Sequence, residues 1–441
     1  SALGGHYTGP TFLQTNEKHP WIEADGMIKD YYSCYRPEWV SSDGSIKTDP
    51  TTGKPYKRGQ YAEWIMFAAQ IPRDEYLKRA KEDFKAEKFD AKEWVRMAKE
   101  AGMKYIVITS KHHDGIALLN TPVGHTIFKD TDIRRDILKE LVNEARKAGL
   151  KIGFYYSQAL DWNNPGGMGW IPQNDAPNRE ASYADKAKYT DEIVIPHLHT
   201  IINDYKVDLI WWDMGASSAP EFKYRMMKAI KNIPGTERLI FNDRMEDKLT
   251  GDFKTPEQSI PDMPSNGDGT DWETCMTLND NWGYAAHDIR WKTTEDVLQK
   301  LIDITSKGGN YLLNIGPKAD GTFPAESINC LEEVGSWMKV NSEAIYGTIP
   351  SPFVSQLDWG RATRKEVDGK QFLYLHVFTQ YWPKDGKLLV PDFGSGIKRA
   401  YLLIDAKKTS LPIDKMGDNH IFSLPLDAPD KISTTIVVET L

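Results

Sequence analysis

From residue 89 to residue 347, short runs of apolar residues alternate with longer stretches in which apolar positions recur every three or four residues. The short runs are continuously apolar, which is typical of strands buried on both faces of a parallel sheet. The longer stretches are typical of helices that cover such a sheet with one face. The predicted strands are residues 104–110, 151–157, 207–213, 238–242 and 310–315. The predicted helices are residues 90–102, 132–149, 183–205, 223–233, 294–307 and 326–346.

The number of strand–helix units predicts a (β/α)8-like barrel, since no Gly-x-Gly-x-x-Gly turn supports a dinucleotide-binding fold. After residue 347 the pattern changes to short strand-like runs separated by Gly, Pro and Asp, which predicts an all-β sandwich. These runs are residues 370–378, 387–390, 399–404, 420–424 and 434–438. We therefore expect an α/β chain with a barrel over residues 1–348 and a C-terminal β-sandwich over residues 349–441.

Composition narrows the classes of protein that remain. The 441 residues carry a formal net charge of −8, which argues against nucleic acid because phosphate binding requires a basic face. No apolar run approaches the ~20 residues of a membrane span. Three scattered cysteines are too few for a disulfide framework or a zinc ribbon. The first residues lack an initiator Met and a signal core, so we expect a periplasmic or secreted protein whose signal peptide has been removed.

Aromatic residues are 11% of the chain, with 14 Trp and 20 Tyr, and many lie in the polar stretches between predicted strands. A place in the core is the ordinary explanation for any single ring. Rings close to carboxylates, however, suit a sugar-binding cleft, because the apolar face of a pyranose packs on a ring while its hydroxyls bond to charged groups. The composition is therefore compatible with a carbohydrate ligand.

Two predicted strands end in residues with catalytic or binding potential. Asp213 follows Trp211 and Trp212 at the end of a strand. A helix cap or a loop salt bridge is the alternative, but the two Trp and the strand end favour a carboxylate in a partly dry pocket. His112 and His113 follow another strand, and adjacent side chains of an extended segment point to opposite sides. We therefore expect at least one of the two to bond a substrate hydroxyl, the alternative for the other being a core histidine. The remaining histidines lack metal-ligand spacing, so no metal is expected.

Several catalytic motifs are absent from the sequence. It has neither a Gly-x-Ser-x-Gly elbow nor a phosphate-binding Gly-Lys-Ser/Thr loop. These absences favour two carboxylates that act as nucleophile and general acid/base. Asp213 is the first, and the second is expected after Arg244, where Glu246, Glu257 and Glu273 are candidates with surface charge as the alternative for each.

Ten segments together resemble the retaining α-L-fucosidase family, glycoside hydrolase family 29. They occur in the family's order and cover nearly all of the chain before the C-terminal domain. The segments are Tyr61-Ala-Glu-Trp64, Phe84-Lys-Ala-Glu-Lys-Phe-Asp90, Lys111-His-His-Asp-Gly115, Gly153-Phe-Tyr-Tyr-Ser157, Trp211-Trp-Asp213, Asn242-Asp-Arg244, Trp272-Glu-Thr-Cys-Met-Thr277, Asn281-Trp-Gly-Tyr284, Asn310-Tyr-Leu-Leu-Asn-Ile-Gly-Pro317 and Asn341-Ser-Glu-Ala-Ile-Tyr-Gly347.

This resemblance implies a barrel with a C-terminal β-sandwich that cleaves terminal α-L-fucosides of oligosaccharides or glycoconjugates, with retention and without a cofactor. It assigns Asp213 as the nucleophile and Glu257 as the acid/base, with Glu273 as the competitor for that role. The positions expected to bind the sugar are Glu63, Trp64, His112, His113, Tyr156, Trp211, Arg244, Glu273 and Trp282.

One segment departs from the family pattern. Family members usually carry His-Trp-Gly on the first strand, whereas the corresponding residues 25–33 contain no His. Either Asp30 or Tyr31 takes its place, or the pocket prefers a related sugar such as α-L-galactose. A non-catalytic carbohydrate-binding relative is the alternative from another class, and loss of the nucleophile would indicate it. Asp213 is present.

Overall fold

The computed structural model describes residues 2–5, 62–64, 66, 72–167, 181–262, 269–286 and 288–441. These residues form a mixed α/β structure with a seven-stranded parallel sheet, two antiparallel sheets, and a two-stranded parallel sheet of β3 (Ile116–Ala117) and β4 (His125–Thr126). None of the helices in these ranges is long and apolar enough to cross a membrane.

The parallel sheet has seven strands in the order β7-β6-β5-β2-β1-β9-β8. All five predicted strands are present, and β1 and β8 are two strands that the sequence pattern did not predict. The strands are β1 (Ala2–Gly5), β2 (Tyr105–Lys111), β5 (Lys151–Ser157), β6 (Leu209–Asp213), β7 (Ile240–Phe241), β8 (Glu273–Thr277) and β9 (Asn310–Asn314). Every neighbouring pair is parallel, so all carboxyl ends meet at one edge.

The two outermost strands of this sheet are linked by isolated parallel bridges. Asn242, next to β7, pairs with Phe253, while Lys254 pairs with Trp272, next to β8. Glu257 pairs with Cys275 within β8. Residues 253–257 therefore connect the two edges of the seven-stranded sheet.

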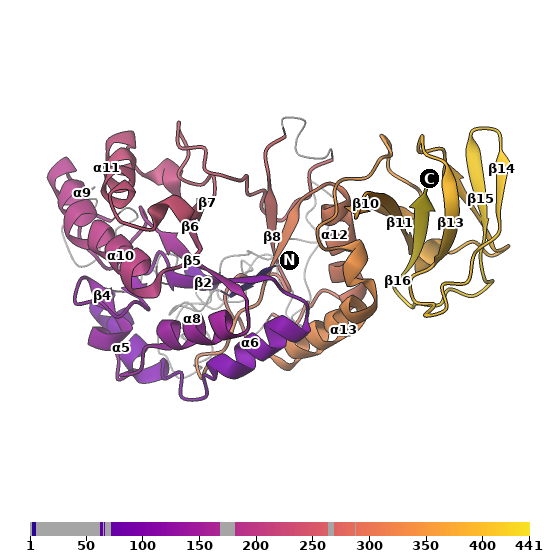
Figure 1. Ribbon diagram of the computed structural model, residues 1–441. Coiled ribbons are helices and arrows are strands. Elements are labelled where there is room, and N and C mark those ends of the chain that lie inside the picture. The colour runs from indigo at the N-terminus through magenta and orange to yellow at the C-terminus, as the bar shows by residue number, and fades with distance from the viewer. Residues whose placement is uncertain are drawn as a thin grey trace, which may run out of the picture.

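Helices follow the strands and cover the parallel sheet (Figure 1). They are α5 (Arg73–Asp83), α6 (Ala91–Glu100), α7 (Ile127–Asp130), α8 (Ile137–Lys147), α9 (Tyr183–Tyr189), α10 (Ile195–Thr200), α11 (Pro220–Lys231), α12 (Thr294–Ser306) and α13 (Ala325–Asn341). Helix α8 begins later than predicted because Asp136 accepts a hydrogen bond from Lys139 N and caps it there. The predicted helix 183–205 is one helical run in which α9 and α10 alternate with π-helical segments.

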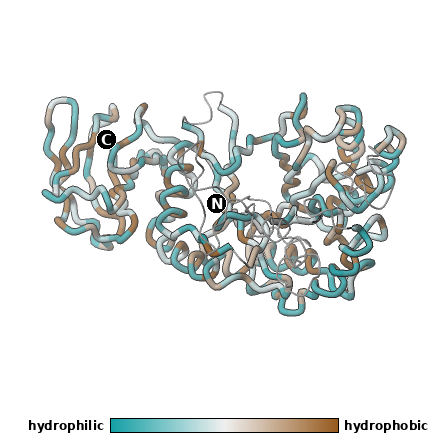
Figure 2. Tube along the Cα trace, turned by 180° about the vertical axis from the view of Figure 1, so that it is seen from behind, coloured by the Kyte–Doolittle hydropathy of each residue, from teal (hydrophilic) through white to brown (hydrophobic). Residues whose placement is uncertain are grey.

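The C-terminal residues form two antiparallel sheets beside α12 and α13 (Figure 1). One contains β10 (Gly360–Val367), β11 (Lys370–Phe378), β13 (Ile397–Leu402) and β16 (Ser433–Thr440), and the other β12 (Lys387–Pro391), β14 (Ile413–Met416) and β15 (Asn419–Ser423). Apolar side chains of both sheets share a core that includes Leu375, Ile436, Val390 and Phe422. Figure 2 shows hydrophobic stretches along these strands.

Polar contacts tie the C-terminal sheets to the helices. Trp337 Nε1 of α13 donates to Ser433 O at 3.2 Å, and Thr435 Oγ1 donates to Asn341 Oδ1 at 2.8 Å. Arg361 of β10 forms an ion pair with Asp303 of α12. The groups of α13 and β16 are buried, so these hydrogen bonds satisfy polar atoms that water does not reach.

Candidate active site

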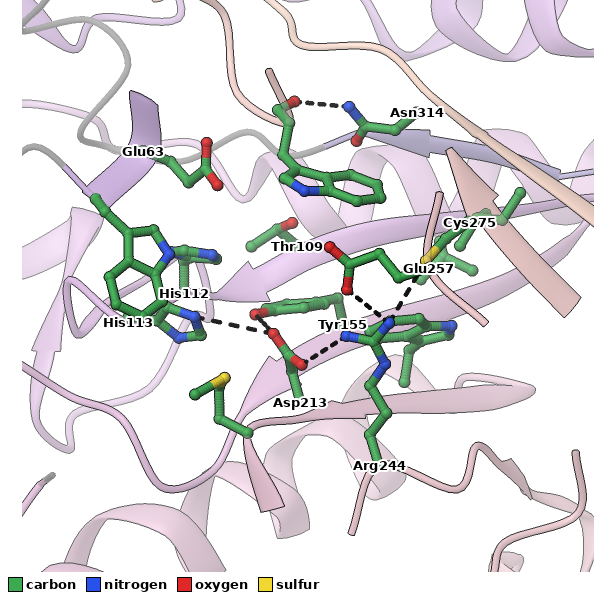
Figure 3. A pocket seen from close by; sticks show the side chains of 16 residues that line it. Glu63, Thr109, His112, His113, Tyr155, Asp213, Arg244, Glu257, Cys275 and Asn314 are labelled. Carbon is green, nitrogen blue, oxygen red and sulfur yellow. Dashed lines mark hydrogen bonds and ion pairs between the residues drawn. The ribbon is translucent and has the colours of Figure 1, made fainter. Parts of the chain in front are cut away.

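A cavity of about 370 Å³ lies at the carboxyl ends of the parallel strands. His112 and His113 reach it from the end of β2, Asp213 from β6 and Asn314 from β9 (Figure 3). Nine of the eleven residues predicted as catalytic or sugar-binding line this one cavity: Glu63, Trp64, His112, His113, Trp211, Asp213, Arg244, Glu257 and Trp282. Within the described ranges, no group of three or more His, Cys, Asp or Glu is arranged to hold a metal ion.

Asp213 receives hydrogen bonds on both carboxylate oxygens. Tyr155 OH donates to Oδ2 at 2.6 Å, and Arg244 Nη1 donates to Oδ1 at 3.0 Å. The side chain is 14% exposed and opens into the cavity. Because the last residue of a buried strand has a fixed backbone, this carboxylate is held in one orientation.

Arg244 binds two carboxylates at once. Its Nη1 pairs with Asp213, while Nη2 pairs with Glu257 Oε2 at 2.9 Å (Figure 3). The guanidinium also lies over the Trp211 ring, 4.5 Å from its centroid. Burial lowers the pKa of Arg244, but the two carboxylates raise it more, so it lies above its ordinary value. The site therefore contains a permanent cation between two carboxylates.

Glu63 is a third carboxyl group in the cavity and is almost completely buried. Gly283 N donates to its Oε2 at 3.3 Å. Burial raises the pKa of Glu63 to about 8, and the nearby charges of Glu257 and Asp213 add to this effect. Glu63 is therefore mostly protonated at neutral pH and can donate a hydrogen bond to a ligand oxygen.

The two histidines do not point to opposite sides, so that expectation is wrong. Strand β2 ends at Lys111, and His112 and His113 lie in the turn that follows, where strand alternation no longer applies. Their ring centroids are 3.9 Å apart, and both rings line the cavity. Neither is a core histidine remote from the site.

The prediction for Tyr156 is wrong, and its neighbour Tyr155 occupies the expected place. Tyr156 points away from the cavity, where its OH lies 3.0 Å from His197 Nδ1 in the core. Tyr155 lines the cavity and bonds to Asp213. Successive residues of a strand face opposite sides, and both sides of β5 are buried, so composition does not tell which tyrosine faces the site.

Glu273 does not reach the cavity either, which corrects its prediction as a sugar-binding residue. It is the first residue of β8, at the end of the sheet opposite the site. There its carboxylate accepts hydrogen bonds from Tyr105 OH and, at 2.9 Å, from Trp211 Nε1. Burial raises the pKa of this carboxyl. Of the two acid/base candidates, only Glu257 lines the cavity with Asp213.

A sequence model of the α-L-fucosidase family matches residues 23–343. The chain belongs to this family. An α-L-fucosidase of Dictyostelium discoideum is 29% identical over an alignment of length 408 that covers 85% of this chain and 85% of that protein. The structure of α-L-fucosidase isoenzyme 1 from Paenibacillus thiaminolyticus is 30% identical with a TM-score of 0.76, covering 87% of this chain and 93% of that one.

A further relative bears on the chemistry of the α-L-fucosidase family. A family 29 α-L-fucosidase of Bacteroides thetaiotaomicron was solved as a trapped covalent intermediate in complex with 2-fluoro-fucosyl fluoride. That structure is 25% identical to this chain, with a TM-score of 0.74 and coverage of 97% of both chains. A covalent intermediate in that relative is the signature of a retaining, two-step mechanism.

Sequence reasoning missed some residues of this family member's cavity. Tyr155, Met214 and Asn314 line it but were not predicted. Asn314 Nδ2 donates to Trp282 O at 2.7 Å, so it holds one of the predicted aromatic residues. Its place at the end of a predicted strand is a signal that could have found it. The stretch 25–33, with Asp30 and Tyr31, lies outside the described residues.

The adjacent tyrosines give a matched pair of variants for this fucosidase-family site. Tyr155→Phe removes a hydrogen bond to a charged carboxylate, worth about 1.5–3 kcal/mol, so we expect kcat/KM to fall about 10–100-fold. Tyr156→Phe should leave kcat/KM within a few-fold of the wild type. It should lower the melting temperature, because His197 Nδ1 in the core loses its contact with the Tyr156 hydroxyl. Kinetics on an aryl α-L-fucoside together with thermal unfolding check both expectations, and the reverse pattern would contradict this assignment.

Glu63 makes a separate prediction about pH. Its pKa is about 8 in the folded protein against an ordinary 4.5, so the folded state holds a proton that the unfolded state releases between these values. The free energy of unfolding should therefore fall as pH rises from about 4.5 to about 8, by a few kcal/mol from this group. Glu63→Gln should remove that dependence. Urea unfolding of both proteins across this range measures the difference, and parallel curves would contradict the prediction.

Proposed function

We propose that this chain is an exo-acting retaining α-L-fucosidase that releases terminal α-L-fucose from fucosylated glycans. The observation that carries the proposal is the placement of Asp213 and Glu257 on the two terminal nitrogens of one guanidinium, at the wall of one cavity. Carboxyl groups bound to the same guanidinium are close together, as the ~5–5.5 Å separation of retaining glycosidases requires.

In the proposed reaction, Asp213 attacks the anomeric carbon while Glu257 donates a proton to the leaving oxygen. The glycosidic bond breaks, and an ester bond forms between the sugar and Asp213. Glu257, now a base, then takes a proton from water as the water attacks the anomeric carbon and releases the sugar. The second displacement returns Asp213 to its carboxylate form, and the two inversions give net retention.

The surrounding groups suit a deoxy sugar. Trp64, Trp211 and Trp282 supply apolar surface for the C–H face and the methyl group, while Glu63 and the two histidines supply polar atoms for hydroxyls. Arg244 offsets negative charge on Asp213 before the attack and on the departing carboxylate after it.

The finer features of the fold also belong to this proposal. We infer a closed (β/α)8-like barrel over residues 1–348, supported by the bridges through which residues 253–257 connect β7 to β8. We infer a β-sandwich over residues 349–441, supported by the apolar core shared by the two antiparallel sheets. A location outside the cytoplasm stays a prediction.

A panel of aryl α-L-glycosides tests the function. We expect α-L-fucoside to be the best substrate and α-L-galactoside to be weaker, by about 10²-fold, because an apolar wall rejects an added hydroxyl only modestly. Asp213→Gly, purified identically, controls for contaminating glycosidases. A higher kcat/KM on the galactoside would overturn the fucose assignment but not the mechanism. Binding of fucose without turnover of any glycoside would instead identify a non-catalytic relative.

A further inference from the structure

The imidazole of His113 contacts the protein interior through one ring nitrogen, and the ring also lines the cavity. Its Nδ1 lies 2.7 Å from Ser157 Oγ, inside the protein. Its Nε2 lies 3.9 Å from Asp213 Oδ2, at the cavity wall (Figure 3). The position of the ring proton therefore decides whether the nitrogen on the cavity side donates or accepts a hydrogen bond.

Ser157 decides this position because a hydroxyl has a single proton. Ser157 Oγ lies 3.1 Å from Leu160 O, a carbonyl that can only accept. If Ser157 donated its proton to His113, its oxygen would face that carbonyl with no hydrogen between them. Donation to Leu160 satisfies both contacts only if His113 Nδ1 carries the ring proton and donates to Ser157.

A buried network keeps Ser157 and Leu160 in place. The ammonium of Lys111, which is fully buried, donates to Ser157 O at 2.8 Å and to Leu160 O at 3.2 Å. It also pairs with the buried carboxylate of Asp161 at 3.2 Å. Asp161 in turn accepts hydrogen bonds from Asn163 N, Asn164 N and Tyr189 OH. A buried pair with this many partners is rigid, since breaking it leaves an uncompensated charge.

The same loop also binds the backbone of the histidine. Trp162 N donates to His113 O at 2.8 Å, and the Trp162 ring packs edge-on against the His113 ring with centroids 5.7 Å apart. Trp64 also packs edge-on against the imidazole, with centroids 5.2 Å apart, and it packs against Trp162 with centroids 5.4 Å apart. Both indoles therefore restrict the movement of the His113 ring.

We propose that Ser157 is a positioning residue that holds His113 as the Nδ1–H tautomer, so that Nε2 accepts a hydrogen bond from one hydroxyl of the bound sugar. The assignment of the tautomer rests on the hydrogen bonds alone, whereas the sugar hydroxyl rests on the proposed function. An acceptor nitrogen at this point of the cavity selects a ligand with a hydroxyl donor there, and an ether or a deoxy carbon loses that bond.

The tautomer is measured directly on the unmodified protein. Long-range ¹H–¹⁵N spectra of protein labelled at the histidine rings, with the signal of His113 identified by its loss in His113→Gln, report the protonation of each nitrogen. We expect a protonated Nδ1 and a pyridine-like Nε2 at pH 7. A protonated Nε2, in either the other tautomer or the imidazolium, would overturn the proposal. This readout needs no substrate, so it stands apart from any failure of the fucosidase assignment.

The role in binding is tested with Ser157→Ala and a series of aryl α-L-fucosides that each lack one hydroxyl. We expect Ser157→Ala to lower kcat/KM on the parent fucoside about 10–100-fold. This is the range found for residues that orient a metal-binding histidine through a hydrogen bond. The deoxy fucoside that lacks the hydroxyl bound by His113 should have a lower kcat/KM than the parent fucoside with the wild type. With Ser157→Ala, the two compounds should have nearly the same kcat/KM. Ser157→Thr, which keeps the hydroxyl, should recover the wild-type pattern.

Ser306→Ala is the matched control, because Ser306 is also buried and donates to a backbone carbonyl, Asp303 O, in α12 away from the cavity. It should lower stability comparably and keep the wild-type ratios among the deoxy compounds. If Ser157→Ala also keeps those ratios, its role is structural only and the positioning proposal is overturned.

Discussion

Asp213→Gly should lower turnover by several orders of magnitude while the protein stays folded. In the proposed reaction this carboxylate supplies the atom that bonds to the sugar, and water in the vacated space cannot form the covalent intermediate. Added azide should partly restore turnover by attacking from the same side, and its product should be the glycosyl azide of inverted configuration. Initial rates, together with the configuration of the azide product, measure both effects.

Asp208→Ala is the control for this experiment. Asp208 lies immediately before the other end of β6, where its carboxylate pairs with Lys151 and accepts from Ile152 N. Loss of that carboxylate should reduce stability slightly and leave turnover within a few-fold of the wild type. Near-normal turnover in folded Asp213→Gly would rule out Asp213 as the nucleophile.

Glu257→Ala should separate substrates by their leaving groups. Alkyl fucosides need a proton on the departing oxygen, so their hydrolysis should fall by about 10²–10⁴-fold. Activated aryl fucosides need little protonation, and their first step should be far less affected. Azide should now yield a product of retained configuration, because the covalent intermediate still forms on Asp213. Kinetics across aryl leaving groups of graded acidity measure this dependence.

Glu273→Ala is the comparison, since the sequence left both glutamates open for this role. Its loss leaves the Trp211 N–H and the Tyr105 hydroxyl without their buried acceptor, so we expect lower stability. The rate should then change equally for all leaving groups. A dependence on the leaving group at Glu273, and none at Glu257, would exchange the two assignments.

Five of the seven strands of the parallel sheet could be predicted because they are apolar, and the helices between them because each has one apolar face. Strand β8 could not, because Glu273, Thr274 and Thr277 make it polar although it is buried. Strands β10 and β14 could not, because charged side chains such as Arg364, Lys365 and Asp414 interrupt their patterns where the sheets face solvent. Helix α8 shows a second limit. Its beginning depends on which acidic residue caps it, and residues 132–136 contain two aspartates.

The candidate site could be predicted as a set of residue types more reliably than as a set of positions. Asp213 follows from a strand end, and parallel strands bring such ends together. The sequence alone does not tell whether Tyr155 or Tyr156 faces the cavity. When both faces of a strand are buried, the register of the neighbouring strands decides which side chains turn toward the site. Glu273 is a second example. Its motif forms strand β8, which reaches the site, but the Glu273 side chain lies at the opposite end of that strand.

The contacts between α13 and the C-terminal sheets bear on how the chain can be divided. Asn341 and Ser433 are buried and find their hydrogen-bond partners across this boundary. Ala344 also packs with Tyr374, Tyr401 and Val437 in one apolar cluster. A chain that ended at residue 348 would expose that cluster and leave Asn341 Oδ1 without Thr435 as its donor. We therefore expect the two parts to melt as one cooperative unit, with the C-terminal sheets required for the stability of the parallel-sheet part.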